Sequence, residues 1–554
     1  MHTDVKTFSR ACLRETFPIL LYVLLFFLLT YGAIFRMSSS FFADMGDGLQ
    51  SVWNIWWLNT AVTELHTSPW YTTYLNFPQG TSLLSHTLNP FNGFLAIFLL
   101  PFFTLIETYN LIVVFSFVMG GYTSFLLARS VTRSYGGSLL AGFIFTFSPY
   151  HFAHAQGHLQ LVSLEWIPLF ILLFRQLLLQ PRLFTALGAG VTLFAVLLCD
   201  YYYFFYSCLA AVGIALWLLF RGRTLGVFFR REYRVPLAAF VATTLATSGL
   251  LIFTLLFVQA HDPFTEGHPS TLFSLDLFSL FIPGGHWLFG RFTEFYWSRL
   301  PASIHETSVS MGVSVLLVLL FVWRRRKQIP TKEVTVWFGL LLFFFIMSLG
   351  PRLHIWGWEV PFLKLPYIVL EKIFPLLVLS GVPVRMMVMV MLCASVLVAM
   401  GWGNLRILFA QRPWLQWGFL ALLLLEYLPT PLPLSNVPIP EYVHILKDAP
   451  SGAVLDTMNE RVSLPLYYQI IHGKPMAFGY ISRDPISVQH QNAVITFLLE
   501  HGDFSRLHTI FGIRYLVLHP GVIPVMQIDP KKALYRSSEA ELYDLTLYSP
   551  HEGE

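Results

Sequence analysis

The sequence predicts an all-α polytopic membrane protein with a small α+β domain at its C-terminus. Of its 554 residues, 55% are hydrophobic and only 12% are charged, whereas a soluble globular protein carries roughly 25% charged residues. The mean hydropathy of +0.61 points the same way. Such a chain must use lipid as its solvent. The net charge is only +4, and no basic tract with interleaved aromatic residues is present, so nucleic acid is excluded as a partner.

The membrane part is predicted from its apolar runs. A membrane-spanning helix needs about 20 mostly apolar residues. The first run follows Lys6, Arg10 and Arg14 and has no small-residue cleavage site before Arg36, so we interpret it as a retained anchor and not as a signal peptide. We expect about eleven spans, near residues 17–36, 109–128, 137–149, 161–176, 183–199, 201–220, 236–258, 306–323, 333–349, 384–402 and 414–430.

Residues 90–106 are also apolar, but Pro90 and Pro101 interrupt them. Cytoplasmic loops of membrane proteins carry an excess of Lys and Arg. If residues 90–106 crossed the membrane, five later basic clusters would face outward. We therefore expect this stretch to lie at the interface or to be re-entrant, which keeps all five clusters inside: Arg129/Arg133, Arg175/Arg182, Arg221/Arg223/Arg230/Arg231, Arg324–Lys327 and Arg406/Arg412.

This topology predicts a cytoplasmic N-terminus and an extracytoplasmic C-terminus. The first outward loop, residues 37–108, contains no Lys or Arg. Residues 1–430 are expected to form the membrane module and residues 431–554 the extracytoplasmic domain. In that domain, alternating apolar residues predict strands at 453–455 and 513–518, and the pattern favours helices near 441–447 and 486–501.

Two carboxylates, Asp44 and Asp47, lie three residues apart just beyond the first span. Ionisable groups at the membrane edge are costly and are often functional. Gly46 and Gly48 let the backbone turn tightly around Asp47. The run that follows has the spacing of an amphipathic interfacial helix. An alternative is that one of the two aspartates caps the N-terminus of that helix.

A second group of candidates follows the third predicted span. His154 and His158 are one helical turn apart, a spacing compatible with metal binding. The alternative is a polar belt at the membrane interface. Glu306 is expected at the outer end of the span 306–323, where it would either position substrate or cap the helix.

Two arginines are candidates for binding phosphate, because a guanidinium group holds phosphate oxygens bidentately. Arg291 lies in the predicted loop 259–305. Arg385 is expected at the outer mouth of the span 384–402, against the usual placement of positive charge inside. We choose Arg385 for a lipid phosphate, with ordinary snorkelling to lipid headgroups as the alternative.

The chain resembles the GT-C superfamily of membrane glycosyltransferases, similar to protein O-mannosyltransferases and to bacterial proteins like the lipid A aminoarabinose transferase. An acidic residue after the first span, inside a long outward loop, carries the resemblance. Two stretches look like bacterial members: Gly46-Asp47-Gly48-Leu49-Gln50 and Ser148-Pro149-Tyr150-His151-Phe152-Ala153-His154. The resemblance implies a polyprenyl-phosphate-sugar donor and a bacterial-type cytoplasmic (inner) membrane location.

The resemblance also implies a hexosyl- or pentosyltransferase that inverts the anomeric carbon. An extracytoplasmic lipid, glycan or protein would be the acceptor. The acidic position of the family falls on Asp47 or Asp44, and we favour Asp47 as base. The expected substrate-binding residues are Arg385, His154, His158, Glu306, Arg291 and Gln50. No cofactor is certain, and a divalent metal stays open. The alternatives are a transporter or lipid flippase, a polymerase or ligase of surface polysaccharide, and a non-catalytic scaffold.

Overall fold

The computed structural model describes residues 2–220, 230–264, 267–379, 381–458, 463–520 and 528–548. Arg221 and Arg223 of the predicted basic cluster lie outside the described residues. The chain divides into two compact units. The first unit comprises Met1–Met37, Asn110–Leu251 and Gly267–Pro433, and the second unit comprises Ser38–Tyr109, Ile252–Glu266 and Leu434–Glu554.

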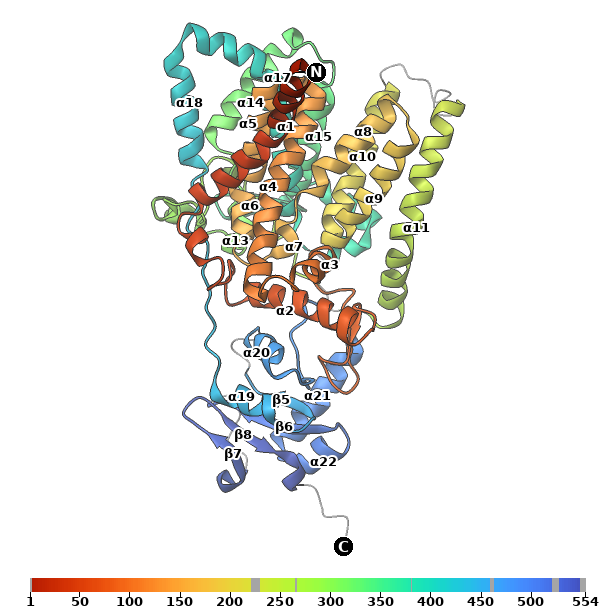
Figure 1. Cartoon of the computed structure of the whole chain (residues 1–554), viewed down its shortest axis with the longest axis vertical. Helices are drawn as coiled ribbons and strands as arrows, with labels where there is room; N and C mark the ends of the chain where they lie inside the picture. The colour runs from red at the N-terminus through yellow and green to blue at the C-terminus, as the bar shows by residue number, and fades with distance from the viewer. Residues whose placement is uncertain are drawn as a thin grey trace. The chain divides into compact units, whose positions relative to one another are not determined.

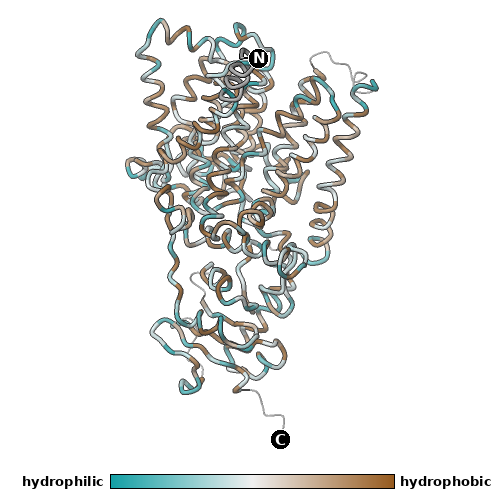
Figure 2. The backbone as a smooth tube through the Cα atoms, in the orientation of Figure 1, coloured by the Kyte–Doolittle hydropathy of each residue, from teal (hydrophilic) through white to brown (hydrophobic). Residues whose placement is uncertain are grey.

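The long helices are apolar along much of their length (Figure 2). Among the described residues, five helical segments are long and apolar enough to cross a membrane: Leu105–Thr132, Leu159–Leu179, Tyr201–Phe220, Arg231–His261 and Pro383–Gln411. These segments identify the chain as an integral membrane protein. The other predicted spans coincide with α1, α5, α9, α14, α15 and α18, and their crossing of the membrane stays a prediction.

The first unit is almost entirely helical (Figure 1). Its main helices are α1 (His2–Leu29), α4 (Leu105–Thr132), α5 (Tyr135–Thr146), α6 (Pro149–His154), α7 (Leu159–Val162), α8 (Trp166–Leu179), α9 (Leu183–Cys199), α10 (Tyr201–Phe220), α11 (Arg231–His261), α13 (Ile304–Thr307), α14 (Val313–Arg325), α15 (Val334–Ser348), α17 (Met387–Gln411) and α18 (Pro413–Glu426). The first residues of α4, up to Tyr109, and the last residues of α11, from Ile252, belong to the second unit. Shorter elements connect them: η1 (Ala33–Arg36), η4 (Leu277–Leu280), η5 (Gly290–Thr293), α12 (Glu294–Trp297), η6 (Arg326–Gln328), the hairpin β3 (Arg352–Ile355) and β4 (Trp358–Lys364), α16 (Tyr367–Ile373), η7 (Pro375–Leu379) and η8 (Pro383–Met386).

Small residues let the helices of the first unit approach closely, as is usual in membrane bundles. Ala128, Ala141 and Ala399 form one buried cluster contributed by α4, α5 and α17. At Gly142, an added Cβ would lie 2.0 Å from the Tyr22 hydroxyl oxygen, and that hydroxyl donates to the Leu139 carbonyl at 3.0 Å. The contact between α1 and α5 therefore requires glycine at position 142.

Glu306 does not begin a membrane span as predicted. It lies on the one-turn helix α13, and α14 begins only at Val313. Gly312, with φ +82°, provides the left-handed residue before α14. Hydropathy alone extended the span backwards to residue 306, because the intervening residues are small or apolar and carry no charge. Glu306 is therefore held by a separate turn.

The second unit combines the first predicted outward loop with the C-terminal segment. The loop contributes α2 (Asp47–Asn59), the π-helical turn η2 (Thr60–Glu64), the short strands β1 (Tyr71–Thr72) and β2 (Thr81–Ser82), and α3 (Pro90–Leu99). The C-terminal segment contributes α19 (Glu441–Asp448), β5 (Ala453–Asp456), α20 (Leu464–His472), α21 (Ile486–Glu500), α22 (Phe504–Thr509), β6 (Ile513–Leu518), η9 (Pro530–Lys532), β7 (Ala533–Arg536), β8 (Glu541–Asp544) and η10 (Leu545–Tyr548).

The C-terminal sheet has the order β5-β6-β8-β7 (Figure 1). β5 and β6 run parallel, and the other two pairs are antiparallel. The predicted strands at 453–455 and 513–518 and the predicted helices near 441–447 and 486–501 are confirmed as β5, β6, α19 and α21. The small α+β structure expected at the C-terminus is therefore present, and its sheet is mixed.

The helices of the first loop differ in part from the expectation. α3 has ten residues, which extend about 15 Å at 1.5 Å per residue, about half of a hydrocarbon core of roughly 30 Å. It is too short to span, in line with the interpretation of residues 90–106. α2, expected to be amphipathic, is buried along most of its length. Trp53 of α2 donates to the Gln469 side-chain oxygen of α20 at 2.7 Å.

Candidate functional site

In the first unit, six polar side chains from four separate segments lie close together. We call this group the histidine–arginine cluster: His154, His158, His286, His305, Glu306 and Arg385. α6 brings in His154 at its last residue, and its start is fixed by Pro149 and by the Ser148 hydroxyl, which accepts from the His151 N–H. α13 carries His305 and Glu306, and η8 carries Arg385.

Glu306 and Arg385 form a buried ion pair. Arg385 donates to Glu306 Oε1 through Nε at 2.9 Å and through Nη2 at 2.5 Å. The side chains are 2% and 13% exposed, respectively. A carboxylate and a guanidinium buried together are mutually required, because either one alone would be an uncompensated buried charge. The structure therefore brings together two of the predicted substrate-binding residues.

His154 lies on the other side of the Glu306 carboxylate. Its Nε2 is 3.7 Å from Glu306 Oε2, too far for a hydrogen bond. Both atoms are buried without a hydrogen-bond partner. His158, four residues on, stays close to His154 because its N–H donates to the His154 carbonyl at 2.9 Å. The two Nδ1 atoms of these histidines are 3.1 Å apart.

The row of imidazoles continues through α13. The His158 and His305 rings are 5.2 Å apart, and the His286 and His305 rings stack at 4.8 Å. His286 Nε2 lies 3.0 Å from His305 Nδ1. Burial, helped by His305 and His158, lowers the pKa of His286 to about 3. Burial also holds the pKa of His154 well below its usual range. These two rings are therefore neutral at physiological pH.

A tyrosine pair packs beside His154. The Tyr150 ring lies 4.5 Å from the His154 ring, and its hydroxyl is 2.8 Å from that of Tyr203. The Tyr203 hydroxyl donates to the Leu161 carbonyl at 2.9 Å. Asp200 accepts the N–H groups of Tyr202 and Tyr203 and so caps α10. Asp200 thus serves as the N-terminal cap of α10.

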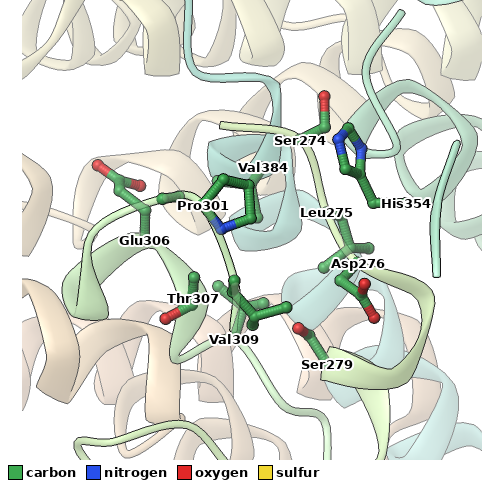
Figure 3. Close-up of a pocket in the computed structure, with 12 residues that line it drawn as sticks. Ser274, Leu275, Asp276, Ser279, Pro301, Glu306, Thr307, Val309, His354 and Val384 are labelled. Atoms are coloured by element: carbon green, nitrogen blue, oxygen red, sulfur yellow. The ribbon is translucent and has the colours of Figure 1, made fainter. Parts of the chain in front are cut away.

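A small cavity of about 10 Å³, room for about one water molecule, lies next to Glu306 (Figure 3). Asp276 and His354 line it together with Glu306. In Figure 3 the Glu306 carboxylate points away from Asp276. Asp276 accepts from the Tyr296 hydroxyl at 2.7 Å and from the Gly357 N–H at 2.7 Å. Its carboxylate is therefore engaged in holding the loops together.

In the second unit, Asp44 and Asp47 have different surroundings. Asp44 Oδ1 accepts the N–H groups of Gly46 and Gly48, both at 2.9 Å. This is the turn that leads into α2, whose first residue is Asp47. Both carboxylates are partly exposed. One oxygen of Asp44 therefore shapes the loop, as the capping alternative supposed, while Asp47 stands at the positive end of the α2 dipole.

Gln50, on the next turn of α2, belongs to a polar cluster around His86. Its Nε2 lies 3.2 Å from the Ser482 hydroxyl and 3.2 Å from His86. Burial and the Arg483 charge lower the pKa of His86 to about 3, and the charge of Asp47 opposes this. Burial raises the pKa of the nearby Asp484 to about 6. Asp47 is therefore close enough to act electrostatically on this cluster.

Not every predicted site residue joins these groups. Arg291 is exposed, on η5, and takes no part in the histidine–arginine cluster. Sequence reasoning also missed His305 and His86. His305 directly precedes Glu306, and this adjacency is the signal that was available. His86 lies in a stretch rich in Ser, Thr and Asn that offers no comparable signal.

The fold is similar to that of known membrane glycosyltransferases. The arabinofuranosyltransferase AftD from Mycobacteria matches with a TM-score of 0.51 and 14% identity, covering 97% of this chain and 42% of AftD. The chain thus spans less than half the length of AftD. This likeness shows a GT-C-like fold and, at this identity, nothing finer.

Two other structures match with lower scores. The archaeal oligosaccharyltransferase AglB from Archaeoglobus fulgidus, in complex with an inhibitory peptide and a dolichol-phosphate, has a TM-score of 0.46 and 12% identity over 91% of this chain and 69% of AglB. ArnT from Cupriavidus metallidurans, bound to undecaprenyl phosphate, has a TM-score of 0.42 and 11% identity over 96% of this chain and 98% of ArnT.

No curated protein sequence matches the chain. A family model does match, over residues 19–423. Since this match covers more than half of the 554 residues, the protein belongs to the family described as Domain of unknown function (DUF6311).

Proposed function

We propose that this protein is an integral membrane glycosyltransferase that moves a sugar from a polyprenyl-phosphate-linked donor to an extracytoplasmic lipid, glycan or protein. The observation that carries the proposal is the fold shared with AftD, an arabinofuranosyltransferase, over 97% of the chain. Because one fold can host many functions, the chemistry must be argued from the site residues. The reaction requires a base and a cation for the leaving phosphate, and the chain offers a residue for each.

The first requirement is a base. In the reaction, the acceptor hydroxyl loses its proton, its oxygen forms a bond to the anomeric carbon, and the bond from that carbon to the phosphate oxygen breaks. Asp47 is the proposed base, since it is partly exposed at the start of α2. Attack from the face opposite the phosphate inverts the anomeric carbon. General-base catalysis of this kind contributes roughly 10²- to 10⁴-fold to the rate.

The second requirement is a cation for the departing polyprenyl phosphate. Arg385 uses two of the five N–H donors of a guanidinium on Glu306. The remaining donors suit phosphate oxygens. Glu306 fixes the plane of the guanidinium, so the cation is oriented before substrate binds, and such preorganisation is the main source of electrostatic catalysis.

The test is complementation of a strain that lacks the protein, with its envelope glycans and lipids profiled by mass spectrometry. The wild-type gene should restore the missing glycosylated product. Asp47→Asn should lower product formation at least a hundredfold, because the amide cannot take the proton, while the amount of protein in the membrane stays unchanged. Restoration of the product by Asp47→Asn would refute Asp47 as the base.

Asp44→Asn is the matched variant. The asparagine oxygen still accepts the N–H groups of Gly46 and Gly48, so the turn into α2 is kept. If Asp44 only shapes the loop, this variant restores the product. Loss of the product in Asp44→Asn as well would give the Asp44 charge a part in the reaction. Movement of a labelled lipid by the purified protein, with no sugar transferred, would support the flippase alternative instead.

A further inference from the structure

We propose that His154, His158 and Glu306 form a binding site for one divalent transition-metal ion with the ligand preferences of zinc. The three side chains offer one donor atom each, and these atoms all lie within 4.8 Å of one another. Metal binding needs only the first unit and does not depend on the proposed transferase reaction.

The first argument is that two of the donor atoms are buried and unsatisfied. His154 Nε2 and Glu306 Oε2 have no hydrogen-bond partner, and their side chains are 0% and 2% exposed. Buried polar atoms are normally paired, and each exception calls for an explanation such as an unseen ion. Both atoms face each other across 3.7 Å, so one ion between them would satisfy both.

The second argument is the spacing. Zinc binds nitrogen and oxygen donors at about 2.0–2.2 Å in a tetrahedral arrangement, which places neighbouring donors about 3.3–3.6 Å apart. The 3.7 Å between His154 Nε2 and Glu306 Oε2 is close to this value. The partly exposed His158 ring offers the third donor, and all three donor atoms lie within 4.8 Å of one another.

The third argument is the kind of donor. Two imidazoles and one carboxylate form a set that catalytic zinc sites use, with the fourth position left open. Magnesium and calcium prefer oxygen donors throughout. Arg385 holds the other oxygen of Glu306 at 2.5 and 2.9 Å, as an outer partner that orients a ligating carboxylate.

The charges of such a site indicate what the open position would accept. A divalent ion, one carboxylate and one guanidinium leave a net charge of about +2, since an imidazole that binds a metal does so in its neutral form. An anionic oxygen of a phosphate group fits this charge. This last step rests on the proposed function, in which Arg385 receives the donor phosphate.

The experiment measures metal binding by the full-length protein in detergent, after chelation and removal of the chelator. Zn²⁺ is titrated by calorimetry, and bound zinc is counted by elemental analysis. We expect one zinc ion per chain and a rise in thermal stability on zinc addition. His158→Ala and Glu306→Gln should each weaken zinc binding at least tenfold and abolish the stabilisation.

His286→Ala is the matched control. His286 belongs to the same row of imidazoles but is not one of the proposed ligands, so this variant should bind zinc like the wild type. Equal weakening by His286→Ala and His158→Ala would overturn the three-ligand assignment. No bound zinc in the wild type, or unchanged binding in His158→Ala, would overturn the site itself.

Folding is checked separately by gel filtration and by thermal unfolding in the presence of chelator. His158→Ala serves here because the His158 side chain is only partly buried. The same samples separate this proposal from the proposed function. Zinc binding without sugar transfer would leave the metal site intact and count against the transferase, whereas sugar transfer by fully zinc-free protein would count against any role of the metal in the reaction.

Discussion

At the scale of single residues, the two aspartates of the first loop show what a sequence can and cannot distinguish. Their spacing placed both beside a helix start, and that helix exists as α2. The sequence could not say which of the two carboxylates accepts hydrogen bonds from the backbone N–H groups of the turn, because this depends on the φ and ψ angles of residues 45–48. The structure gives both hydrogen bonds to Asp44, which separates a loop-shaping residue from the base candidate.

The histidine–arginine cluster follows the same pattern. The sequence predicts site residues at the membrane-edge positions 154, 158, 306 and 385, and the structure brings these four together; their roles stay predictions. Arg291 was chosen on the same grounds, yet it is exposed on η5. Hydropathy predicts depth along the membrane normal but not direction within the bundle, so it cannot tell which edge residues face one another.

His519 provides a residue-scale prediction of pH dependence. Its Nε2 lies 3.0 Å from Asp456 Oδ1, and its Nδ1 lies 3.1 Å from the Glu539 carbonyl. Burial lowers the pKa of His519, but the hydrogen bond to Asp456 and the charges of Asp456 and Glu539 outweigh it, so the pKa is raised. Tyr442 packs against the same ring.

A raised pKa means that the folded state favours the protonated ring. The stabilisation is fully present below the unfolded pKa of about 6.5 and is lost as pH rises through the higher folded value. The wild type should therefore melt at a higher temperature than His519→Gln. This difference in melting temperature should be largest near pH 5.5 and should narrow as the pH rises. A gap that stays constant from pH 5.5 to 9 would contradict this.

At the scale of elements, the helices were predicted well and their ends less well. Each of the eleven predicted spans coincides with a helix, because long apolar runs leave few alternatives in lipid. The start of α14 was missed by several residues. That start is set by a distant partner, Glu426 of α18, which accepts the N–H of Val313 at 2.6 Å and of Ser314 at 3.1 Å. Such a cap is invisible in local sequence.

The same cap makes Gly312 a sensitive position. Its φ is +82°, and an added Cβ would lie 2.6 Å from Glu426 Oε2. Gly312→Ala should therefore destabilise the protein by about 1–3 kcal/mol, the usual cost of a strained backbone, with further loss if Glu426 is displaced. Thermal unfolding in detergent measures this loss of stability.

Gly339→Ala is the control. Nothing lies within 4 Å of a Cβ added at Gly339 in α15, and alanine is favoured over glycine by about 0.5–1 kcal/mol inside a helix. Equal melting temperatures for both variants would contradict the argument.

At the scale of the whole molecule, composition predicts one boundary near residue 430. The two compact units are each built from several separate segments of the chain. The second unit is built from Ser38–Tyr109, Ile252–Glu266 and Leu434–Glu554. One of its cores unites Trp53, Trp57 and Leu75 of the first loop with Leu466 and Met476 of the C-terminal segment. Composition is read along the chain, so it cannot reveal that two segments some 400 residues apart share a core.

This shared core leads to a prediction about fragments. A fragment of residues 434–554 alone would expose the apolar surface that Trp53, Trp57 and Leu75 cover, and would leave Gln469 without the Trp53 N–H. Burying an aromatic side chain of this size is worth roughly 1.5–3 kcal/mol, while whole domains are stable by only about 5–15 kcal/mol. We therefore expect the fragment to melt broadly and to bind a hydrophobic dye such as ANS.

Joining residues 38–109 to the same fragment through a flexible linker provides the control. It restores the tryptophan contacts. It also returns Leu49 to a second buried cluster, which contains Val443, Val454 and Tyr468. This version should unfold cooperatively and bind little dye. If residues 434–554 alone unfold cooperatively without dye binding, the C-terminal segment is an independent domain, and the boundary indicated by composition is the physical one.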